Sequence, residues 1–475
     1  MEKQFVKEIA DIEENFAQWY TDVVLKTGLV DYGPVKGTMV IRPYGYAIWE
    51  NIQKDLDRRF KENGAKNAYF PLLIPMSYFT KEAEHVEGFA PEVAVVTHAG
   101  GAKLDEPLAI RPTSETIIGT MYSKWIQSYR DLPVIMNQWC NVMRWEKTTR
   151  PFLRTSEFLW QEGHTVFSSE EEAMENTMRM LNVYKEFAEE TLAIPVICGR
   201  KTEKEKFAGA VATFGMEAMM LDGKSLQAGT SHYLGQNFAK SFDIKYLDKD
   251  GTLKYGYTTS WGVSTRLIGA VIMAHGDQRG LVLPPKVAPI EVIVVPVAAH
   301  KGGVIEKAKE IESALLKAGI RVETDCRDMS PGWKFNEWEM KGVPVRIEIG
   351  PRDIENGVAV VVRRDTLEKN TVKIEDLAAY IPETLSKMQE EMLVSSRERR
   401  DKKIVEADSL DGILSGVEGK NFVKAGWCGC RDCEDKVKEY AQATARVMCD
   451  EEGVPEKCAI CGKPAQHKVI FARAY

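Results

Sequence analysis

Apolar residues recur at helical spacing near the start of the chain and then give way to shorter apolar runs. Ile48, Ile52, Leu56 and Phe60 would lie on one face of a helix that Gly64 is placed to end. Residues 67–75 are predicted to form a strand, and a second long helix is predicted around residues 170–190. This mixture of helices and apolar strands continues to about residue 285.

The pattern changes after a proline-rich break at residues 283–289, which suits a linker. Beyond it, short apolar runs alternate with helical patterns, and this alternation predicts a small, mostly parallel α/β domain. A charged stretch at 395–403 then leads into a cysteine-rich tail. We predict three domains, at residues 1–285, 286–390 and 404–475. The predicted strands of the second domain are 290–296, 320–325, 343–349 and 358–363, and its helices are 304–318 and 334–341.

One segment of the first domain combines apolar strand residues with arginines, acids and a histidine. Residues 142–146 and 151–164 are predicted to be two strands joined by a short basic loop at 147–150. Arginines in such a hairpin could hold a triphosphate, and its acids could bind a small amine. An ordinary charged hairpin with solvated ends is the alternative. The apolar residues assigned to these strands are Val142, Phe152, Leu153, Phe158 and Leu159.

The second strand of this hairpin alternates two sets of side chains. Because neighbouring side chains of a strand point to opposite faces, one set can turn toward a ligand while the other packs behind. The first set is Phe158, Trp160, Glu162 and His164, and the second is Leu159, Gln161 and Gly163.

Three further polar segments could add to such a site. Residues 111–116 place a hydroxyl and a carboxylate two positions apart, on one face if the segment is extended. Residues 227–232 are predicted to be a glycine-containing polar turn, and 260–269 to open a helix with one arginine. Structural roles are the alternative for each: helix caps for Thr113 and Ser264, a turn histidine for His232 and a buried ion pair for Arg266.

Composition narrows the class of protein. The chain has 475 residues, 44% of them hydrophobic and 28% charged, as expected of a soluble globular protein. Its net charge of −7 argues against a uniformly basic nucleic-acid binder but allows local basic patches. No apolar run approaches the length of a membrane span, and the first ten residues lack a signal peptide. We therefore expect a cytoplasmic protein.

Six of the nine cysteines follow Trp427, which in a cytoplasmic chain indicates metal binding. Four thiolates would form a closed tetrahedral zinc site with a structural role. Cys458 and Cys461 form a clear C-x2-C pair. On the other side, Cys433 can pair with Cys430 or Cys428, and spacing alone favours Cys430.

Together these segments resemble a known family. Residues 143–146 with 154–164 resemble motif 2 of the class II aminoacyl-tRNA synthetases, and 261–266 resemble motif 3. The helix at 44–64 with the strand after it resembles motif 1, the dimer motif of the family. Residues 111–115 and 229–238 resemble signatures of prolyl-tRNA synthetases of the archaeal and eukaryotic-like type, and the resemblance runs nearly from end to end.

The resemblance implies a fold and a reaction. The fold would be an α+β catalytic domain on an antiparallel sheet, an α/β anticodon-binding domain and a small C-terminal α+β zinc-binding domain. The reaction would attach L-proline to tRNA(Pro) with ATP, through a prolyl-adenylate and then transfer to the tRNA 3′ end. Because the proline carboxylate is already an anion, positioning and charge stabilisation would suffice without a general base. A homodimer is also implied.

The resemblance further implies a nucleotide site. Arg144 would be the catalytic residue, holding both the α-phosphate and the proline carboxylate. Gln227 would lie near Mg²⁺, an ion that takes few protein ligands besides phosphate oxygens. The residues of the ATP and magnesium site would be Arg144, Glu146, Arg154, Gln227, Thr230, Ser264 and Arg266.

A proline site is implied beside it, in which Glu115 and Thr113 receive the secondary ammonium and aromatic rings enclose the pyrrolidine. Such a pocket separates ligands that differ by one methylene by only about 1–3 kcal/mol, so alanine and cysteine should enter. The short span between motifs 2 and 3 predicts no editing domain. The proline-binding residues would be Thr113, Glu115, Arg144, Phe158, Trp160, Glu162, His164, Phe207, His232, Ser260 and Gly262.

The resemblance extends to the other two domains. Glu339 and Arg346 fall where family members read guanines of the proline anticodon, with surface ion pairing as the alternative. The family's usual C-x4-C spacing selects Cys428, Cys433, Cys458 and Cys461 as zinc ligands, with Cys430 and then Cys449 as alternates. Tyr475 matches a family habit of directing the chain terminus toward the active site.

Two competing functions remain open at this stage. A non-catalytic tRNA-binding or regulatory protein is disfavoured because Arg144, Arg154 and Arg266 are all present. A sister ligase for threonine or another amino acid is disfavoured by the loop at Thr113 and by the Thr-Ser-His sequence at 230–232.

Overall fold

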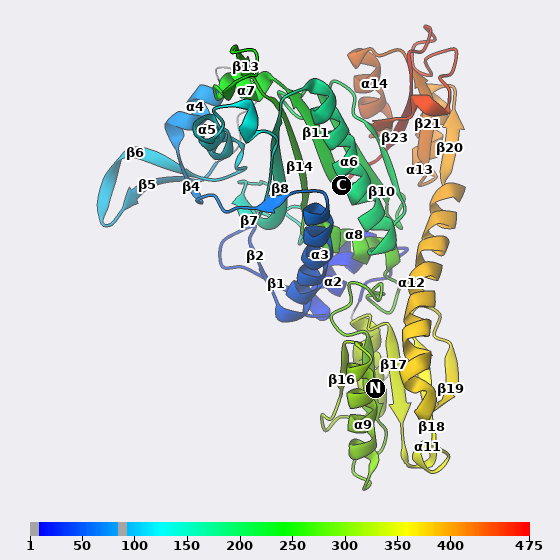
Figure 1. Cartoon of the computed structure of the whole chain (residues 1–475). Coiled ribbons are helices and arrows are strands. Elements are labelled where there is room, and N and C mark those ends of the chain that lie inside the picture. Colours follow the sequence, from blue (N-terminus) through cyan, green and yellow to red (C-terminus); the bar gives the residue numbers. More distant parts are fainter. Residues whose placement is uncertain (1–8, 84–92) are drawn as a thin grey trace.

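The computed structural model describes residues 9–83 and 93–475. Of the first ten residues, which are predicted to lack a signal peptide, residues 1–8 lie outside the described part of the chain. Three regions follow one another along the chain: a large α+β domain, a second domain at one end of it, and a third against its side (Figure 1). Among the described residues, no helix is both long and apolar enough to cross a membrane.

A seven-stranded sheet forms the centre of the first region. All of its neighbouring strands are antiparallel except β3 and β7, which confirms the predicted antiparallel sheet. In spatial order the strands are β3 (Lys66–Asn67), β7 (Val134–Met143), β8 (Glu157–Phe167), β14 (Tyr257–Ser264), β11 (Ser225–Gly235), β10 (Ala212–Met219) and β9 (Val196–Arg200).

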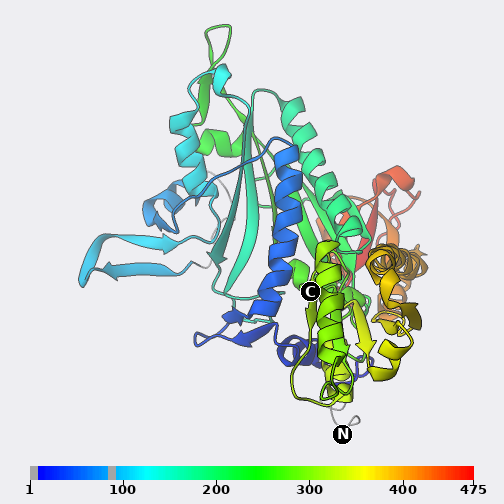
Figure 2. The same ribbon diagram turned by 60° about the horizontal axis from the view of Figure 1, so that its bottom comes forward.

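Two long helices, α3 (Pro43–Glu62) and α6 (Glu170–Glu190), lie over one face of this sheet (Figure 2). The apolar stripe of α3 is buried as its spacing predicts, and Gly64 follows the helix with a φ of +85°. The ring of Phe60 packs within about 6 Å of the rings of Tyr184 and Trp261. A Cβ on Gly163 would lie 2.1 Å from the Trp261 ring, so only glycine fits there.

Four local predictions were wrong. Residues 260–264, expected to open a helix, belong to β14, and α8 begins only at Arg266. The hairpin loop spans residues 144–156, because β7 ends at Met143; Phe152 and Leu153 are buried loop residues, and Phe152 has a φ of +60°. Residues 227–232, expected to turn, lie within β11, where a β-bulge interrupts the ladder before Gly229. Residues 67–75 do not form one strand but contribute to β3 and β4. Between these strands the backbone N–H of Phe70 donates a hydrogen bond to the Gln138 side chain instead of to a neighbouring strand.

Smaller elements surround the sheet. A three-stranded sheet in the order β4–β6–β5 projects from the first region (Figure 1). The helices are α2 (Phe16–Lys26), α4 (Met76–Ala83), α5 (Glu115–Trp125), α7 (Asn237–Ser241), α8 (Arg266–His275) and the 3-10 turn η1 (Tyr129–Asp131). The strands are β1 (Val30–Tyr32), β2 (Met39–Ile41), β4 (Leu73–Pro75), β5 (Val95–Ala99), β6 (Ala102–Ile110), β12 (Lys245–Leu247) and β13 (Leu253–Tyr255).

The second region is an α/β domain, as predicted, but its sheet is mixed. The pairs β15–β16 and β15–β17 are parallel, whereas β17–β18 and β18–β19 are antiparallel. The sequence prediction of a mostly parallel sheet missed β19, which is polar and lies at an edge. The elements are β15 (Val292–Pro296), α9 (Val304–Lys317), β16 (Val322–Thr324), α10 (Pro331–Met340), β17 (Val345–Ile349), α11 (Pro351–Glu355), β18 (Val358–Arg363), β19 (Lys369–Lys373) and η2 (Ile374–Asp376).

Helix α12 (Leu377–Lys402) runs from the second region past the first to the third (Figure 1). Its Gln389 amide donates to the carbonyl oxygens of Glu190 and Thr191, each at 3.1 Å, and Arg399 donates to the carbonyl oxygen of Ala274 at 2.7 Å. The proline-rich linker is also packed, with Val287 and Ala288 buried in the core of the first region. Helix α12 continues past residue 390, where the second domain was predicted to end. The predicted limits of the three domains therefore stay predictions.

The third region has a four-stranded sheet in the order β20–β21–β23–β22, with two helices. Its core includes Trp427, Val437 and Phe471. The elements are β20 (Ile404–Ala407), α13 (Leu410–Glu418), β21 (Phe422–Trp427), α14 (Arg431–Ala441), β22 (Thr444–Met448), η3 (Asp450–Glu452) and β23 (His467–Ala472).

Candidate functional site

A cavity of about 530 Å³ opens on the face of the central sheet that points away from α3 and α6. Strand register explains which side chains reach it. His164 of β8 lies opposite Ser260, which in turn lies opposite His232 and then Thr213. Because opposite residues of antiparallel strands share a face, this row forms a continuous strip across four strands.

The cavity collects nearly all residues that the sequence assigned to substrate binding. Within the two predicted substrate sites, Glu146 and Arg154 alone lie outside its lining. The predicted residues that line it are Thr113, Glu115, Arg144, Phe158, Trp160, Glu162, His164, Phe207, Gln227, Thr230, His232, Ser260, Gly262, Ser264 and Arg266. The alternation predicted for β8 therefore holds, since its even-numbered members face the cavity.

A buried carboxylate lies at one end of the cavity. Glu162 accepts hydrogen bonds from the backbone N–H of Ser114 at 3.2 Å and from Nε2 of Gln138 at 3.0 Å, and its Oε2 lies 3.0 Å from Nε2 of His164. Burial alone would raise the pKa of Glu162, but hydrogen bonds from His164, Ser114 and Gln138 hold that pKa below its ordinary value. This end of the cavity therefore presents a fixed negative charge.

Aromatic rings and a neutral histidine stand around that carboxylate. The His232 ring packs 4.8 Å from the Phe207 ring, and its Nδ1 lies 2.9 Å from Oγ1 of Thr213. Burial lowers the pKa of His232 to about 3, helped by the charge of His164, so His232 is neutral near pH 7. The resulting cup combines an apolar wall with an acidic floor, which suits a small, apolar amine.

The other end of the cavity gathers arginines. Arg266 begins α8, directly after β14, and donates from Nε to the carbonyl oxygen of Leu153 at 3.1 Å. Burial lowers the pKa of Arg266 to about 10, and the neighbouring charges of Arg154 and Arg144 act in the same direction. Guanidinium groups that repel one another in this way are stabilised by a polyanion.

Arg144 lies between the two ends. Its guanidinium carbon is 5.3 Å from the centre of the Trp160 ring and 5.6 Å from that of Phe158, and its Nε donates to the carbonyl oxygen of Pro112 at 3.0 Å. Outside the lining, Arg154 and Glu146 form an ion pair of 3.5 Å. Arg144 is therefore placed to contact both an anion and a ligand in the aromatic cup.

The segment 111–116 is not extended throughout, because α5 begins at Glu115. Glu115 is buried at the start of this helix, and Thr113 precedes it in the loop. Arg111 faces away from the cavity and donates to the carbonyl oxygens of Phe70 and Asn141 at 2.6 and 2.8 Å. Thr113 and Glu115 thus reach the cavity through a loop and a helix start, and Arg111 anchors that loop.

Several lining residues were not predicted to bind substrate, although five of the seven lie within the segments 111–116, 227–232 and 260–269 that the sequence singled out. Alternation across residues 212–219 would have pointed to Thr213, which shares the face of His232. Glu205 lies in an irregular segment that carries no periodic signal. The missed residues are Pro112, Glu205, Thr213, Ala228, Gly229, Trp261 and Val263.

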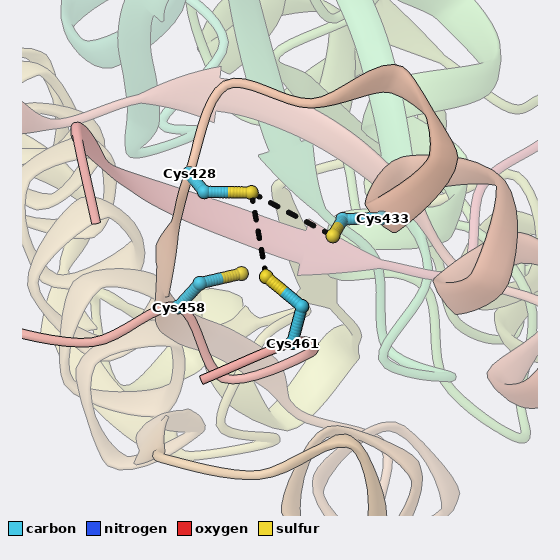
Figure 3. Close-up of side chains that lie close together, drawn as sticks. All are labelled: Cys428, Cys433, Cys458 and Cys461. Carbon is cyan, nitrogen blue, oxygen red and sulfur yellow. Dashed lines mark hydrogen bonds between the residues drawn. The ribbon is translucent and has the colours of Figure 1, made fainter. Parts of the chain in front are cut away.

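Four cysteines of the third region form a separate cluster. The Sγ atoms of Cys428, Cys433, Cys458 and Cys461 lie within 4.8 Å of one another (Figure 3). The Cys428 sulfur is 3.6 Å from those of Cys433 and Cys461, close to the roughly 3.8 Å edge of a tetrahedron with 2.3 Å Zn–S bonds. The donor set and spacing fit a zinc ion. Cys430, favoured by spacing alone, is exposed outside this group.

The two predicted anticodon residues contact each other in the second region. Arg346 donates from Nη1 to Glu339 at 2.9 Å and from its other nitrogens to Glu348, and Arg279 of the first region reaches Glu339 at 3.0 Å. Tyr475 lies beside β11, donating from its backbone N–H to Ser225 and from its hydroxyl to Asp222.

Comparisons with known proteins agree with this arrangement. Family models match residues 99–275 (tRNA synthetase class II core domain for G, H, P, S and T), 291–384 (anticodon binding domain) and 410–475 (C-terminal domain of prolyl-tRNA synthetase). The proline–tRNA ligase of Alkaliphilus oremlandii is 61% identical over 477 residues, covering 100% of this chain and 99% of the relative. The chain belongs to the prolyl-tRNA synthetase family.

Two further relatives support the assignment. The proline–tRNA ligase 2 of Clostridioides difficile is 57% identical over 477 residues, with 100% of this chain and 99% of the relative covered. A crystal structure of prolyl-tRNA synthetase from Cryptosporidium parvum, complexed with halofuginone and AMPPNP, matches with a TM-score of 0.94 at 42% identity. That match covers 98% of this chain and 99% of the other.

As a prolyl-tRNA synthetase, the protein attaches L-proline to tRNA(Pro) with ATP. Its C-terminal domain is typical of the archaeal and eukaryotic-like type of this family. None of the three matched domains, at residues 99–275, 291–384 and 410–475, is an editing domain.

Proposed function

We propose that the cavity builds prolyl-adenylate, with ATP at its arginine end and proline in its acidic, aromatic end. The observation that carries this proposal is the position of Arg144, which lies over Trp160 and Phe158 and adjoins the charges of Arg266 and Glu115. A guanidinium there can hold the α-phosphate and the proline carboxylate together. The two reacting groups are then neighbours before reaction.

In the ATP half, Arg154 and Arg266 grip phosphates and Glu146 faces the adenine side. Gln227, Thr230 and Ser264 contribute polar contacts from the strand ends. Their presence on one face of the sheet, together with the repulsion among the arginines, supports these roles. The AMPPNP in the Cryptosporidium relative is an ATP analogue, which agrees with a nucleotide in this half.

In the proline half, Glu115 and Thr113 receive the secondary ammonium. Phe158, Trp160 and Phe207 enclose the ring, while Ser260 and Gly262 form the floor. Glu162, His164 and His232 form the polar edge, where Glu162 is held as an anion and His232 as a neutral group. The proline carboxylate attacks the α-phosphorus and pyrophosphate leaves. A hydroxyl of the tRNA 3′ end then takes the prolyl group from the adenylate, and AMP leaves.

Two metal ions accompany this function. Mg²⁺ fits the ATP half because it needs few protein ligands, and the amide of Gln227 can supply one beside phosphate oxygens. A bound Mg²⁺ would neutralise phosphate charge. Zn²⁺ would be held by the four-cysteine cluster, closing the loops at the ends of β21 and β23.

Proline-dependent ATP–pyrophosphate exchange tests the cavity. Replacing Arg144 with alanine should lower kcat/KM for exchange by at least about a hundredfold, because both substrates lose a charged contact. Arg179→Ala is the matched control, since Arg179 is a surface arginine that pairs with Glu175 along α6. An Arg144→Ala protein with exchange equal to that of the control would refute the site.

Glu339 and Arg346 are proposed to read anticodon guanines. Glu339→Ala and Arg346→Ala should raise the KM for tRNA(Pro) and leave ATP–pyrophosphate exchange unchanged, because exchange needs no tRNA. Exchange that fell in parallel with aminoacylation would assign these residues to domain packing instead, since Glu339 also pairs with Arg279.

We further propose a homodimer in the cytoplasm, with domain limits near residues 1–285, 286–390 and 404–475. Exposed apolar side chains on β1, β2, α3 and the segment from β3 to β4 support the dimer: Tyr32, Val40, Tyr46, Tyr69 and Leu73. Light scattering should give twice the 53.5 kDa of one chain. Tyr69→Glu should shift the mass toward one chain, and a wild-type mass of one chain would contradict the dimer.

A further inference from the structure

The third region packs against the same face of the central sheet that carries the cavity. Strand β22 lies over β9 and β10 at two glycines that belong to this face. A Cβ on Gly199 would lie 2.4 Å from the carbonyl oxygen of Met448, and one on Gly215 would lie 2.5 Å from Cε of Lys201. The absence of side chains at both positions lets β22 and the Lys201 side chain lie directly on the sheet.

A buried ionic cluster joins the two regions there. Glu217 of β10 contacts Nζ of Lys201 at 2.5 Å and accepts from Arg446 of β22 at 3.0–3.2 Å. Its Oε2 also accepts from Oγ of Ser225 at 2.6 Å. The side chains of Lys201 and Glu217 are each 1% exposed and that of Arg446 is 9% exposed. Burial alone would raise the pKa of Glu217, but Lys201 and Arg446 hold it below its ordinary value.

This cluster adjoins the strand segment that carries Gln227. Glu217 lies directly opposite Gln227 across the β10–β11 ladder, and Ser225 is two residues before it. Strand β14 pairs with β11 only from Thr230 onward, so the other edge of residues 225–227 is not held by a neighbouring strand. There the chain end closes the edge, because Ser225 exchanges backbone hydrogen bonds with Arg473 and Tyr475 at 2.7 and 3.1 Å.

A contribution to stability alone does not account for these charges. Buried ion pairs can often be replaced by apolar residues without loss of stability, whereas they do fix one geometry where the hydrogen bonds are complete. Here the hydrogen bonds converge on one carboxylate beside the predicted nucleotide contacts. That carboxylate is also one of the charges that favour the protonated form of Arg266.

We propose that Arg446 is a positioning residue for ATP: through Glu217 and Ser225 it fixes the start of β11 and thereby the Gln227 side chain. The zinc-bearing region thus completes the ATP half of the site without contacting the nucleotide itself. This inference rests on the proposed role of Gln227 in binding ATP.

The test measures KM for ATP and for proline separately by ATP–pyrophosphate exchange with the full-length protein. Arg446→Met should raise the KM for ATP about tenfold, because Glu217 loses its charged partner, while the KM for proline changes less than about twofold. Arg446→Lys, which keeps the charge, should recover most of the affinity for ATP. Ser225→Ala removes only the hydroxyl that joins Glu217 to β11 and should raise the KM for ATP about threefold.

Asp435→Asn is the matched control. It removes the 2.5 Å ion pair between Lys204 and Asp435, which joins the same two regions away from β11, and should leave both KM values unchanged. Equal rises in both KM values for Arg446→Met, or an unaltered KM for ATP, would overturn the inference. If Arg446→Met fails to fold, an unaltered KM for ATP in Ser225→Ala overturns it.

Gln227→Ala separates this inference from the proposed ATP site. It should raise the KM for ATP at least as much as Arg446→Met. If Gln227→Ala raises that KM while Ser225→Ala and Arg446→Met do not, the positioning role alone is refuted. If Gln227→Ala leaves it unchanged, the proposed nucleotide role of Gln227 is wrong and this inference falls with it.

Discussion

Oε2 of Glu162 lies 3.0 Å from Nε2 of His164, two residues along the same strand and on the same face. The carboxylate also accepts hydrogen bonds from Ser114 and Gln138. Glu162 therefore stays ionised within the cavity although it is buried, and it ties the loop before α5 to the central sheet.

Replacing Glu162 with glutamine should weaken proline binding more than ATP binding. The amide removes the negative charge and places an NH₂ group where one of the present partners now donates, so one buried donor loses its acceptor. We expect the KM for proline to rise about tenfold or more in ATP–pyrophosphate exchange. Glu170→Gln, at the exposed start of α6, is the control. Parallel changes in both KM values would argue against this role.

Alanine should be attached to tRNA(Pro) and remain attached. The aromatic cup around Phe207 and Trp160 can exclude larger amino acids by size, but a smaller one loses only about 1–3 kcal/mol of contact. Alanyl-tRNA(Pro) should therefore accumulate in an aminoacylation assay at high alanine concentration. Hydrolysis of preformed alanyl-tRNA(Pro) by the purified protein would contradict this expectation, since none of the matched domains is an editing domain.

Two cysteines separated by one residue should differ in their effect on zinc. Cys428→Ser removes a sulfur that lies within the four-sulfur group, whereas Cys430→Ser alters an exposed thiol outside it. We expect Cys428→Ser to lose zinc and to melt at a lower temperature, because metal binding contributes to folding. Elemental analysis and thermal melting measure both effects. Zinc retained in Cys428→Ser and lost in Cys430→Ser would reverse the ligand assignment.

Acid should destabilise the protein partly through His275. This residue donates from Nε2 to the carbonyl oxygen of Leu192 at 2.8 Å, and burial lowers its pKa from 6.5 to about 4. Between these pH values the unfolded chain binds the proton and the folded chain does not, so stability present above pH 6.5 is lost as the pH falls toward 4.

His275→Gln should reduce this loss by up to about 1.4 kcal/mol per pH unit. Melting temperatures at pH 7 and pH 5 measure it: the variant should lose fewer degrees than the wild type over this interval. His98→Gln, an exposed histidine of β5, controls for the substitution itself. An equal decrease in wild type and His275→Gln would refute the assignment.

Regular alternation of side chains allowed the part of the site on β8 to be predicted. On β11 the strand itself was missed, because its alternation is interrupted. The alternation between Phe158 and His164 suffices to orient β8, because the intervening odd-numbered residues, such as the fully buried Gln161, pack behind the sheet. Strand β11 was mistaken for a turn because Gly229 and several polar residues obscured its alternation. Gln227, Thr230 and His232 face the cavity, and the bulge before Gly229 shifts the period by one.

Contacts between residues far apart in the chain could not be predicted from the sequence pattern around either residue. Glu217 meets Arg446 only because β22 folds onto β10, and neither residue lies in a pattern that indicates the other. The zinc ligands show the same limit, since C-x2-C spacing favoured Cys430. In the structure Cys430 precedes the first turn of α14 and is exposed, whereas Cys433 is buried one turn later.

Helix α12 is a long rigid element that joins the second region to the third along the side of the first. At 1.5 Å per residue its 26 residues extend about 39 Å, and its hydrogen bonds to residues 190, 191 and 274 lock it to the catalytic domain. These contacts hold the anticodon-binding domain at a set distance from the cavity that we propose for adenylate formation. We therefore expect the protein to distinguish tRNAs by length, because a tRNA whose stacked arm is one base pair longer or shorter would present its anticodon and its 3′ end out of step with the two sites.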